Sequence, residues 1–144
     1  MTIQIDYDRS ERNYKWVDPE SGEVFTFPSG KENKAAAWRF ALSMLDSDLH
    51  DAAQRWADET PQIERLIWKG AELVATGGVD EKSATLHMVA SSDSFGRYAV
   101  EQSDHGHTCQ CISYTDHPQY DQHGNTFCKH IAAVVLHAVA RAEY

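Results

Sequence analysis

The sequence lacks any long apolar run and any basic, apolar leader. Nothing in its 144 residues approaches the stretch of about 18 apolar residues that a membrane-spanning helix needs. The first six residues, MTIQID, have neither the basic start nor the apolar core of a secretion signal. Hydrophobic and charged contents of 42% and 24% are ordinary for a globular chain. We therefore expect a cytoplasmic protein without a membrane partner.

Cysteine is scarce and odd in number. The chain has three cysteines, and an odd count argues against a framework of paired disulfides. Free thiols that bind a metal are typical of the reducing cytosol. The composition therefore does not fit a small, disulfide-rich secreted domain.

Positive charge is in the minority. Lys and Arg number 13 against 22 Asp and Glu, which gives a net charge of −9 with His neutral. A long nucleic-acid footprint normally appears as a basic surface. The acidic balance therefore favours a protein partner, although it leaves room for a local basic patch.

Signatures of common enzyme classes are missing as well. The chain has no Gly-x-x-x-x-Gly-Lys-Ser/Thr loop to hold a phosphate. It contains neither the His-x-Glu nor the Pro-Cys-x-x-Cys element of zinc deaminases. We predict that the protein is not an enzyme and has no catalytic residues.

What the chain does have is a concentrated set of metal-ligating residues near its end. All three cysteines lie there, as Cys109-Gln110-Cys111 and then Cys128-Lys129-His130. Three thiols and an imidazole in two tight pairs are typical of a tetrahedral zinc site. Thiolate and imidazole together suit Zn²⁺ among the common metals. We predict that Cys109, Cys111, Cys128 and His130 bind Zn²⁺.

The local sequence predicts how these ligands are held. A one-residue gap places Cys109 and Cys111 on the same face of an extended strand. An apolar run that reads as a helix starts at Ile131, so Cys128 should lie just before the helix and His130 in its first turn. Four protein ligands leave no open coordination position, so the predicted zinc is structural.

This pattern resembles the SWIM zinc finger, with Cys-x-Cys, a variable spacer, and Cys-x-His at the head of an apolar helix. The resemblance covers roughly residues 84–142 and includes Tyr98-Ala99-Val100 upstream and Cys128-Lys129-His130-Ile131-Ala132-Ala133-Val134 at the end. It implies a zinc-stabilised ββα frame that mediates contacts with protein or DNA, usually within larger DNA-handling proteins. Residues 1–76 lie outside it.

Periodicity and turn chemistry predict an α+β fold. Residues 2–7 form a short strand, and a hairpin of residues 14–17 and 23–27 follows around the turn Asp18-Pro19-Glu20-Ser21-Gly22. Helices are expected over 31–45, 48–58 and from Thr60-Pro61 to Gly77-Gly78, with caps at Ser29, Ser47 and Thr60. Strands are expected over 84–90, 95–101 and 108–112, a loop over 116–125 and a helix over 128–142. We place a boundary between regions 1–78 and 79–144 and expect the two to pack as one compact unit.

The aromatic side chains of the hairpin allow two interpretations. The hairpin aromatics Tyr14, Trp16, Phe25 and Phe27 are expected to form the core of a small sheet, with a base-stacking surface as the alternative. Inward positions of the last helix are expected at Ile131, Val134, Val135, Ala138, Val139 and Ala142. Histidines crowd the C-terminal part, at positions 105, 107, 117, 123, 130 and 137. His105 and His107 could compete for the metal, but Cys109 and Cys111 already supply one complete ligand pair. A second metal site would need several of these histidines to converge, so we do not expect one.

Two functions remain open at this point. The first is a small accessory factor that binds another protein, beside DNA-processing machinery, through the zinc module and the polar segment 113–126. The second is a nucleic-acid-binding protein that uses Lys31, Lys34, Arg39 and Lys129, together with the hairpin aromatics. The partner, the pathway, the oligomeric state and the role of the N-terminal region do not follow from the sequence.

Overall fold

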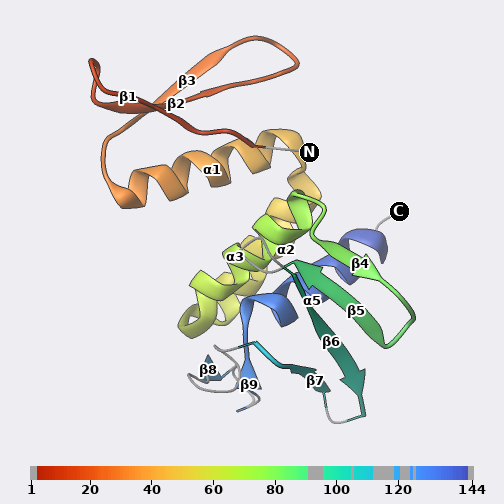
Figure 1. Ribbon diagram of the computed structural model, residues 1–144. Helices are drawn as coiled ribbons and strands as arrows, with labels where there is room; N and C mark the ends of the chain where they lie inside the picture. The colour runs from red at the N-terminus through yellow and green to blue at the C-terminus, as the bar shows by residue number, and fades with distance from the viewer. Residues whose placement is uncertain are drawn as a thin grey trace. The chain divides into compact units, whose positions relative to one another are not determined.

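The protein consists of two compact units, an N-terminal unit that ends at His50 and a C-terminal unit that begins at Asp51. The computed structural model describes residues 3–90, 96–104, 106–111, 119–120, 124 and 126–142 (Figure 1). The sequence placed the boundary between residues 78 and 79, whereas the two units meet at His50 and Asp51. The third helix packs against the last one, so it belongs to the C-terminal unit.

The fold is α+β, as predicted. Each unit holds its own antiparallel sheet, three-stranded in the N-terminal unit and four-stranded in the C-terminal unit. Among the described residues, no helix combines the length and the apolar character that crossing a membrane requires.

The N-terminal unit begins with a three-stranded antiparallel sheet in the order β1-β2-β3. Its strands are β1 (Asp6–Asp8), β2 (Asn13–Val17) and β3 (Val24–Pro28). The β2–β3 hairpin confirms the predicted turn: the Asp18 amide donates to the Glu23 carbonyl at 2.9 Å, and Gly22 takes a φ of +74° that favours glycine. The first strand is shorter and later than the predicted 2–7.

Helix α1 (Lys31–Leu45) packs against this sheet through Phe40. The Phe40 ring lies 6.1 Å from the ring of Trp16, 4.9 Å from that of Phe25 and 5.7 Å from that of Phe27, between centroids. Trp16 is only 2% exposed and stacks on Phe25. The interpretation of the hairpin aromatics as core is confirmed for Trp16, which is too buried to stack on a base.

The helix starts differ from the predicted caps. Helix α1 begins after Gly30, which has a φ of +126°, and its start carries no side-chain cap, so the predicted Ser29–Glu32 capping box does not form. Helix α2 (Ser47–Glu59) is preceded by Asp46, whose carboxylate accepts a hydrogen bond from the Leu49 amide at 3.2 Å. The cap is therefore Asp46 rather than Ser47. An N-cap side chain normally accepts a hydrogen bond from the amide two or three residues later, and Leu49 is three residues after Asp46.

The third helix also starts in a modified way. Thr60 makes no side-chain cap and is followed by a short 3₁₀ turn, η1 (Pro61–Ile63), before α3 (Glu64–Ala75). Its end follows the prediction. The Gly78 amide donates to the Leu73 carbonyl at 2.8 Å and Gly77 to the Val74 carbonyl at 3.1 Å, which is a Schellman ending.

The C-terminal unit contains a four-stranded antiparallel sheet in the order β4-β5-β6-β7. The strands are β4 (Val79–Glu81), β5 (Leu86–Ala90), β6 (Arg97–Ser103) and β7 (Gly106–Cys109). Strand β4 was not predicted, since three residues are too few to show alternation. A two-stranded ladder, β8 (Gln119–Tyr120) with β9 (Thr126–Phe127), occupies part of the predicted loop. Of the remaining residues of that loop, the structure describes only Gly124.

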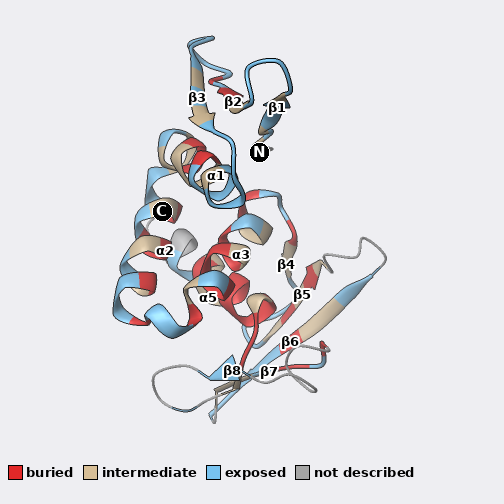
Figure 2. Cartoon of the chain, turned by 90° about the vertical axis from the view of Figure 1, so that its left-hand side faces the viewer, coloured by how far each residue is buried: buried red, intermediate tan, exposed pale blue. Residues whose placement is uncertain are grey.

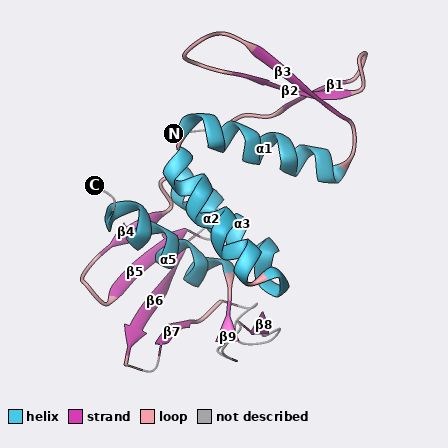
Figure 3. Cartoon of the chain, turned by 180° about the vertical axis from the view of Figure 1, so that it is seen from behind, coloured by secondary structure: helices cyan, strands magenta, loops and turns pink. Residues whose placement is uncertain are grey.

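Helix α5 (Lys129–Ala142) lies between α3 and the four-stranded sheet (Figure 3). Figure 2 shows that buried residues concentrate along α3 and the first turns of α5. Because two layers cover this helix, its first turns are buried on several sides. The buried residues are Ile131, Ala132, Ala133, Val134 and Leu136.

The prediction of the α5 core was therefore partly wrong. Ile131 and Val134 are buried as expected, but Val135 is half-buried and Ala138 and Val139 are exposed. The expected set assumed one apolar stripe along the whole helix, whereas cover is concentrated at its start. The side chain of Ala142 lies outside the described residues.

Candidate metal centre

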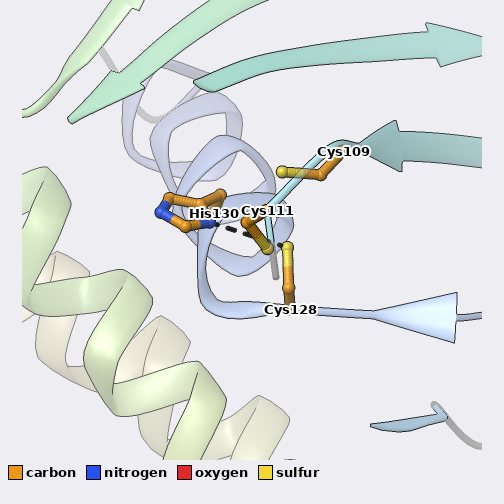
Figure 4. A group of neighbouring side chains, drawn as sticks. All are labelled: Cys109, Cys111, Cys128 and His130. Carbon is orange, nitrogen blue, oxygen red and sulfur yellow. Dashed lines mark hydrogen bonds between the residues drawn. The ribbon is translucent and has the colours of Figure 1, made fainter. Parts of the chain in front are cut away.

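The predicted ligands come from the end of one strand and the start of one helix (Figure 4). Cys109 is the last residue of β7, Cys128 stands between β9 and α5, and His130 is the second residue of α5. The predicted places of Cys128 and His130 are confirmed. The strand predicted over 108–112 stops at Cys109, so Cys111 lies in a bend rather than on the strand.

The four side chains converge. Their ligating atoms all lie within 4.8 Å of one another, and the Cys128 Sγ lies 3.9 Å from the His130 Nδ1. Four donors on one Zn²⁺, at about 2.1–2.3 Å from the metal, would lie roughly 3.5–3.8 Å apart. The group therefore needs to contract by about 1 Å at most to coordinate one tetrahedral ion.

All four residues are buried, with exposed fractions of 2% for Cys109, 3% for Cys111, 0% for Cys128 and 2% for His130. All three cysteines are free thiols. A buried set of thiols and an imidazole matches a closed coordination site better than a surface cluster of acidic residues would.

The thiols perturb each other's ionisation. The Cys128 thiol donates a hydrogen bond to Cys109, and this lowers the pKa of Cys109 to about 4. The same bond to the Cys109 thiolate, together with burial, raises the pKa of Cys128. Ionisation of Cys109 therefore opposes ionisation of Cys128, and a bound dication would favour the ionised form of both thiols.

The neighbours of the ligands hold the site in place. The Ala132 amide donates to the Cys128 carbonyl at 3.0 Å, which ties Cys128 to the first turn of α5. The ring of Tyr98 on β6 lies 4.9 Å from that of His130. Among the described residues, the buried Nε2 of His130 has no hydrogen-bond partner, so Nδ1 is the nitrogen that faces the thiols.

One supporting residue was not singled out from the sequence. Phe127, next to Cys128, is 4% exposed and meets the ring of Trp56 edge-on at 5.4 Å. This contact connects helix α2 to the residue before a ligand. An aromatic directly before a Cys-x-His pair is the signal that points to such a packing role.

The residues of the nucleic-acid alternative fall in different units. Lys31, Lys34 and Arg39 lie on α1 in the N-terminal unit, and Lys129 lies in the C-terminal unit. Two further basic residues, Arg65 and Lys69, lie near Lys129. Burial lowers the pKa of Lys69, and the nearby charges of Arg65 and Lys129 lower it further.

Among the described residues, the neighbouring His107 does not belong to the four-residue group. His107 lies on β7, and burial followed by the charge of His87 lowers its pKa. His105, His117 and His123 lie outside the described residues.

Comparison with protein-family models, with curated proteins and with solved structures found no match for this chain.

Proposed function

We propose that this protein binds Zn²⁺ through Cys109, Cys111, Cys128 and His130, and that the metal stabilises the C-terminal unit. The observation that carries the proposal is the convergence of four buried ligating atoms within 4.8 Å. Three thiolates and one imidazole select Zn²⁺ over Mg²⁺ or Ca²⁺, which prefer oxygen ligands.

The position of the ligands supports a structural role. The metal would join the end of β7 and the following bend to the start of α5, which are more than a dozen residues apart in the chain. Binding of a structural zinc supplies on the order of 10 kcal/mol to folding. Four protein ligands also leave no position for a substrate.

Cobalt substitution tests the ligand set. Co²⁺ bound to thiolates absorbs strongly through charge transfer from sulfur, whereas Co²⁺ bound only to nitrogen and oxygen does not. We expect this absorption in the wild-type chain, its loss in Cys128→Ser, and its retention in the control His50→Gln. A cobalt-loaded wild-type protein without sulfur charge-transfer absorption would refute the proposed site.

We further propose that the protein is an accessory factor that binds another protein, beside DNA-processing machinery as the SWIM resemblance implies. The net charge of −9 supports a protein partner. So do exposed apolar side chains on the C-terminal unit, with Tyr120 53% and Val139 36% exposed.

Affinity capture from native cell extract tests the partner. We expect the wild-type chain to retain one protein at near-stoichiometric amount through washes at 0.5 M salt. Tyr120→Ser tests whether that apolar side chain contributes, and Glu20→Ser is the exposed control. Recovery of no stable protein would count against this proposal.

The alternative function is nucleic-acid binding, and one observation favours it. Lys69, Arg65 and Lys129 lie close enough for their charges to interact, beside the start of α5. Phosphates are favoured at such a place. Binding should then weaken steeply with salt and weaken further in Lys129→Gln. If neither single- nor double-stranded nucleic acid binds at low salt, this alternative fails.

A further inference from the structure

A second group of histidines lines a cavity in the C-terminal unit. The cavity has a volume of about 540 Å³ and is open to solvent. His87 from β5, His107 from β7 and His137 from α5 line it, together with Glu81 from β4. Four different elements therefore each contribute one side chain of a metal-ligating type.

Strand register explains why these residues share one face. His87 pairs with Val100 on β6, and Val100 pairs with Cys109 on β7. Paired residues point to the same face of a sheet, and so do residues two apart along a strand. His107 is two residues before Cys109, so it lies on the same face as His87.

Helix α5 covers that face and completes the group. His130 and His137 are seven residues apart, which is two helical turns or about 10 Å along the axis. One end of this helix–sheet layer thus carries the thiol group, and His137 lies two turns further on. The ring of His137 lies 6.0 Å from that of His87, between centroids.

His87 has an acidic neighbour near one ring nitrogen and no hydrogen-bond partner, among the described residues, at the other. It is 5% exposed, and its Nε2 lies 3.8 Å from the Oε1 of Glu81. Its buried Nδ1 has no hydrogen-bond partner among the described residues. At 3.8 Å the carboxylate does not yet hydrogen-bond this nitrogen, but a small approach would form that bond and fix the tautomer that leaves Nδ1 free for a metal.

We propose that His87, His107 and His137 bind a second divalent transition-metal ion of the borderline class, such as Zn²⁺, with Glu81 as the outer partner of His87. Two imidazoles on one tetrahedral Zn²⁺ have ring centroids about 5 Å apart. The ring centroids of His87 and His137 lie 6.0 Å apart, and the ligating atoms of these histidines do not converge as those of the thiol group do. Metal binding therefore requires the half-exposed ring of His137 to turn inward, for which the cavity has room.

The ionisation of these side chains is consistent with the geometry. Burial lowers the pKa of His87, and burial together with the charge of His87 lowers that of His137. Metals bind neutral imidazole. Three protein ligands leave a fourth position that faces the cavity and takes water or a small ligand.

The test counts zinc per chain in the full-length protein without a histidine tag. After loading with Zn²⁺ and removal of free metal, elemental analysis should give two ions per wild-type chain and one in His137→Gln. Because His137 is half-exposed, this variant keeps the fold, whereas the buried His87 is a less safe choice. The control His50→Gln should retain two ions.

Two further measurements separate this site from the thiol site. The sulfur charge-transfer absorption of Co²⁺ should persist in His137→Gln, since that variant leaves the cysteines intact. Glu81→Gln should lower the affinity for the second Zn²⁺ ion by about 10- to 100-fold without loss of the first ion.

The outcomes are distinct. One zinc per wild-type chain, or two in both wild type and His137→Gln, would overturn the second site and leave the thiol site standing. A chain without sulfur charge-transfer absorption that still loses one zinc in His137→Gln would refute the thiol site and support the second one.

Discussion

Gly70 lies where α3 packs tightly against α5. A Cβ placed on it would stand 2.6 Å from the Cβ of Ala132 and 2.7 Å from the amide nitrogen of Ala133. Both separations are far below van der Waals contact, and a backbone atom cannot turn aside as a side chain can. At the residue scale, then, the absence of one methyl group sets the distance between the helix that carries His130 and its neighbour.

Gly70→Ala should therefore destabilise the protein. Alanine is favoured over glycine in a helix by up to about 1 kcal/mol, but overpacking a core costs about 1–3 kcal/mol or more. We expect the free energy of unfolding in urea to fall by about 1 kcal/mol or more. Glu72→Ala, at an exposed position of the same helix, is the control and should change little. A Gly70→Ala protein more stable than wild type would contradict the close packing.

Asp8 offers a test of electrostatics in the N-terminal unit. Its carboxylate accepts a hydrogen bond from the Lys15 ammonium at 2.9 Å, and this contact, with help from Ser10, places the pKa of Asp8 well below its usual range. A carboxyl whose pKa is lowered on folding adds stability above the unfolded-state pKa and loses it as the pH falls further. NMR titration should show Asp8 ionised well below pH 3.8. Lys15→Met should raise that midpoint, and an unchanged midpoint would rule out the pairing.

Residue chemistry made the grouping of Cys109, Cys111, Cys128 and His130 predictable, since thiols and imidazole have few other reasons to gather in such pairs. It did not reveal Gly70 or His87. Gly70 matters because Ala132, 62 positions later on another helix, packs against it. The surroundings of His87 depend on how the strands pair across the sheet. Neither relation has a local signal in the sequence.

Elements were predicted where their patterns are local. The hairpin followed from its turn residues, and the C-terminal end of α3 followed from Gly77-Gly78. Predictions were wrong where the neighbours of an element, rather than its own sequence, decide which residues are buried or which strands pair. Helix α5 is covered by two layers near its start, so a single-stripe pattern misplaced its core. The three-residue strand β4 exists because β5 offers it an edge, not because its sequence is strand-like.

The packing of α1 on the hairpin gives a prediction at this scale. Trp16 is 2% exposed and touches the rings of Phe25 and Phe40. Replacing a buried Trp by Ala costs about 3–5 kcal/mol through lost contacts and the cavity left behind. Trp16→Ala should therefore unfold or strongly loosen the N-terminal unit, measured by urea denaturation.

The neighbouring residue supplies the control for this experiment. Val17 is 51% exposed and points to the opposite face of the strand. Val17→Ala should change stability by no more than about 0.5 kcal/mol. Equal effects of the two substitutions would show that the hairpin does not bury its aromatic face.

At the scale of the whole molecule, the two units differ in what stabilises them. The N-terminal unit has an aromatic core around Trp16 and Phe40. The C-terminal unit has the buried thiol group at the junction of its sheet and α5. The net stability of a domain is about 5–15 kcal/mol, and a structural zinc contributes on the order of 10 kcal/mol. Loss of zinc should therefore unfold the C-terminal unit.

The most direct test is thermal unfolding with and without a strong chelator, followed by NMR of the tryptophan indole N–H groups. Trp56 and Trp68 lie in the C-terminal unit and Trp16 in the N-terminal unit. After zinc removal, confirmed by elemental analysis, we predict that the signals of Trp56 and Trp68 lose their dispersion, that Trp16 keeps its own, and that added Zn²⁺ restores the original spectrum. An unchanged melting profile in the zinc-free protein would contradict the account.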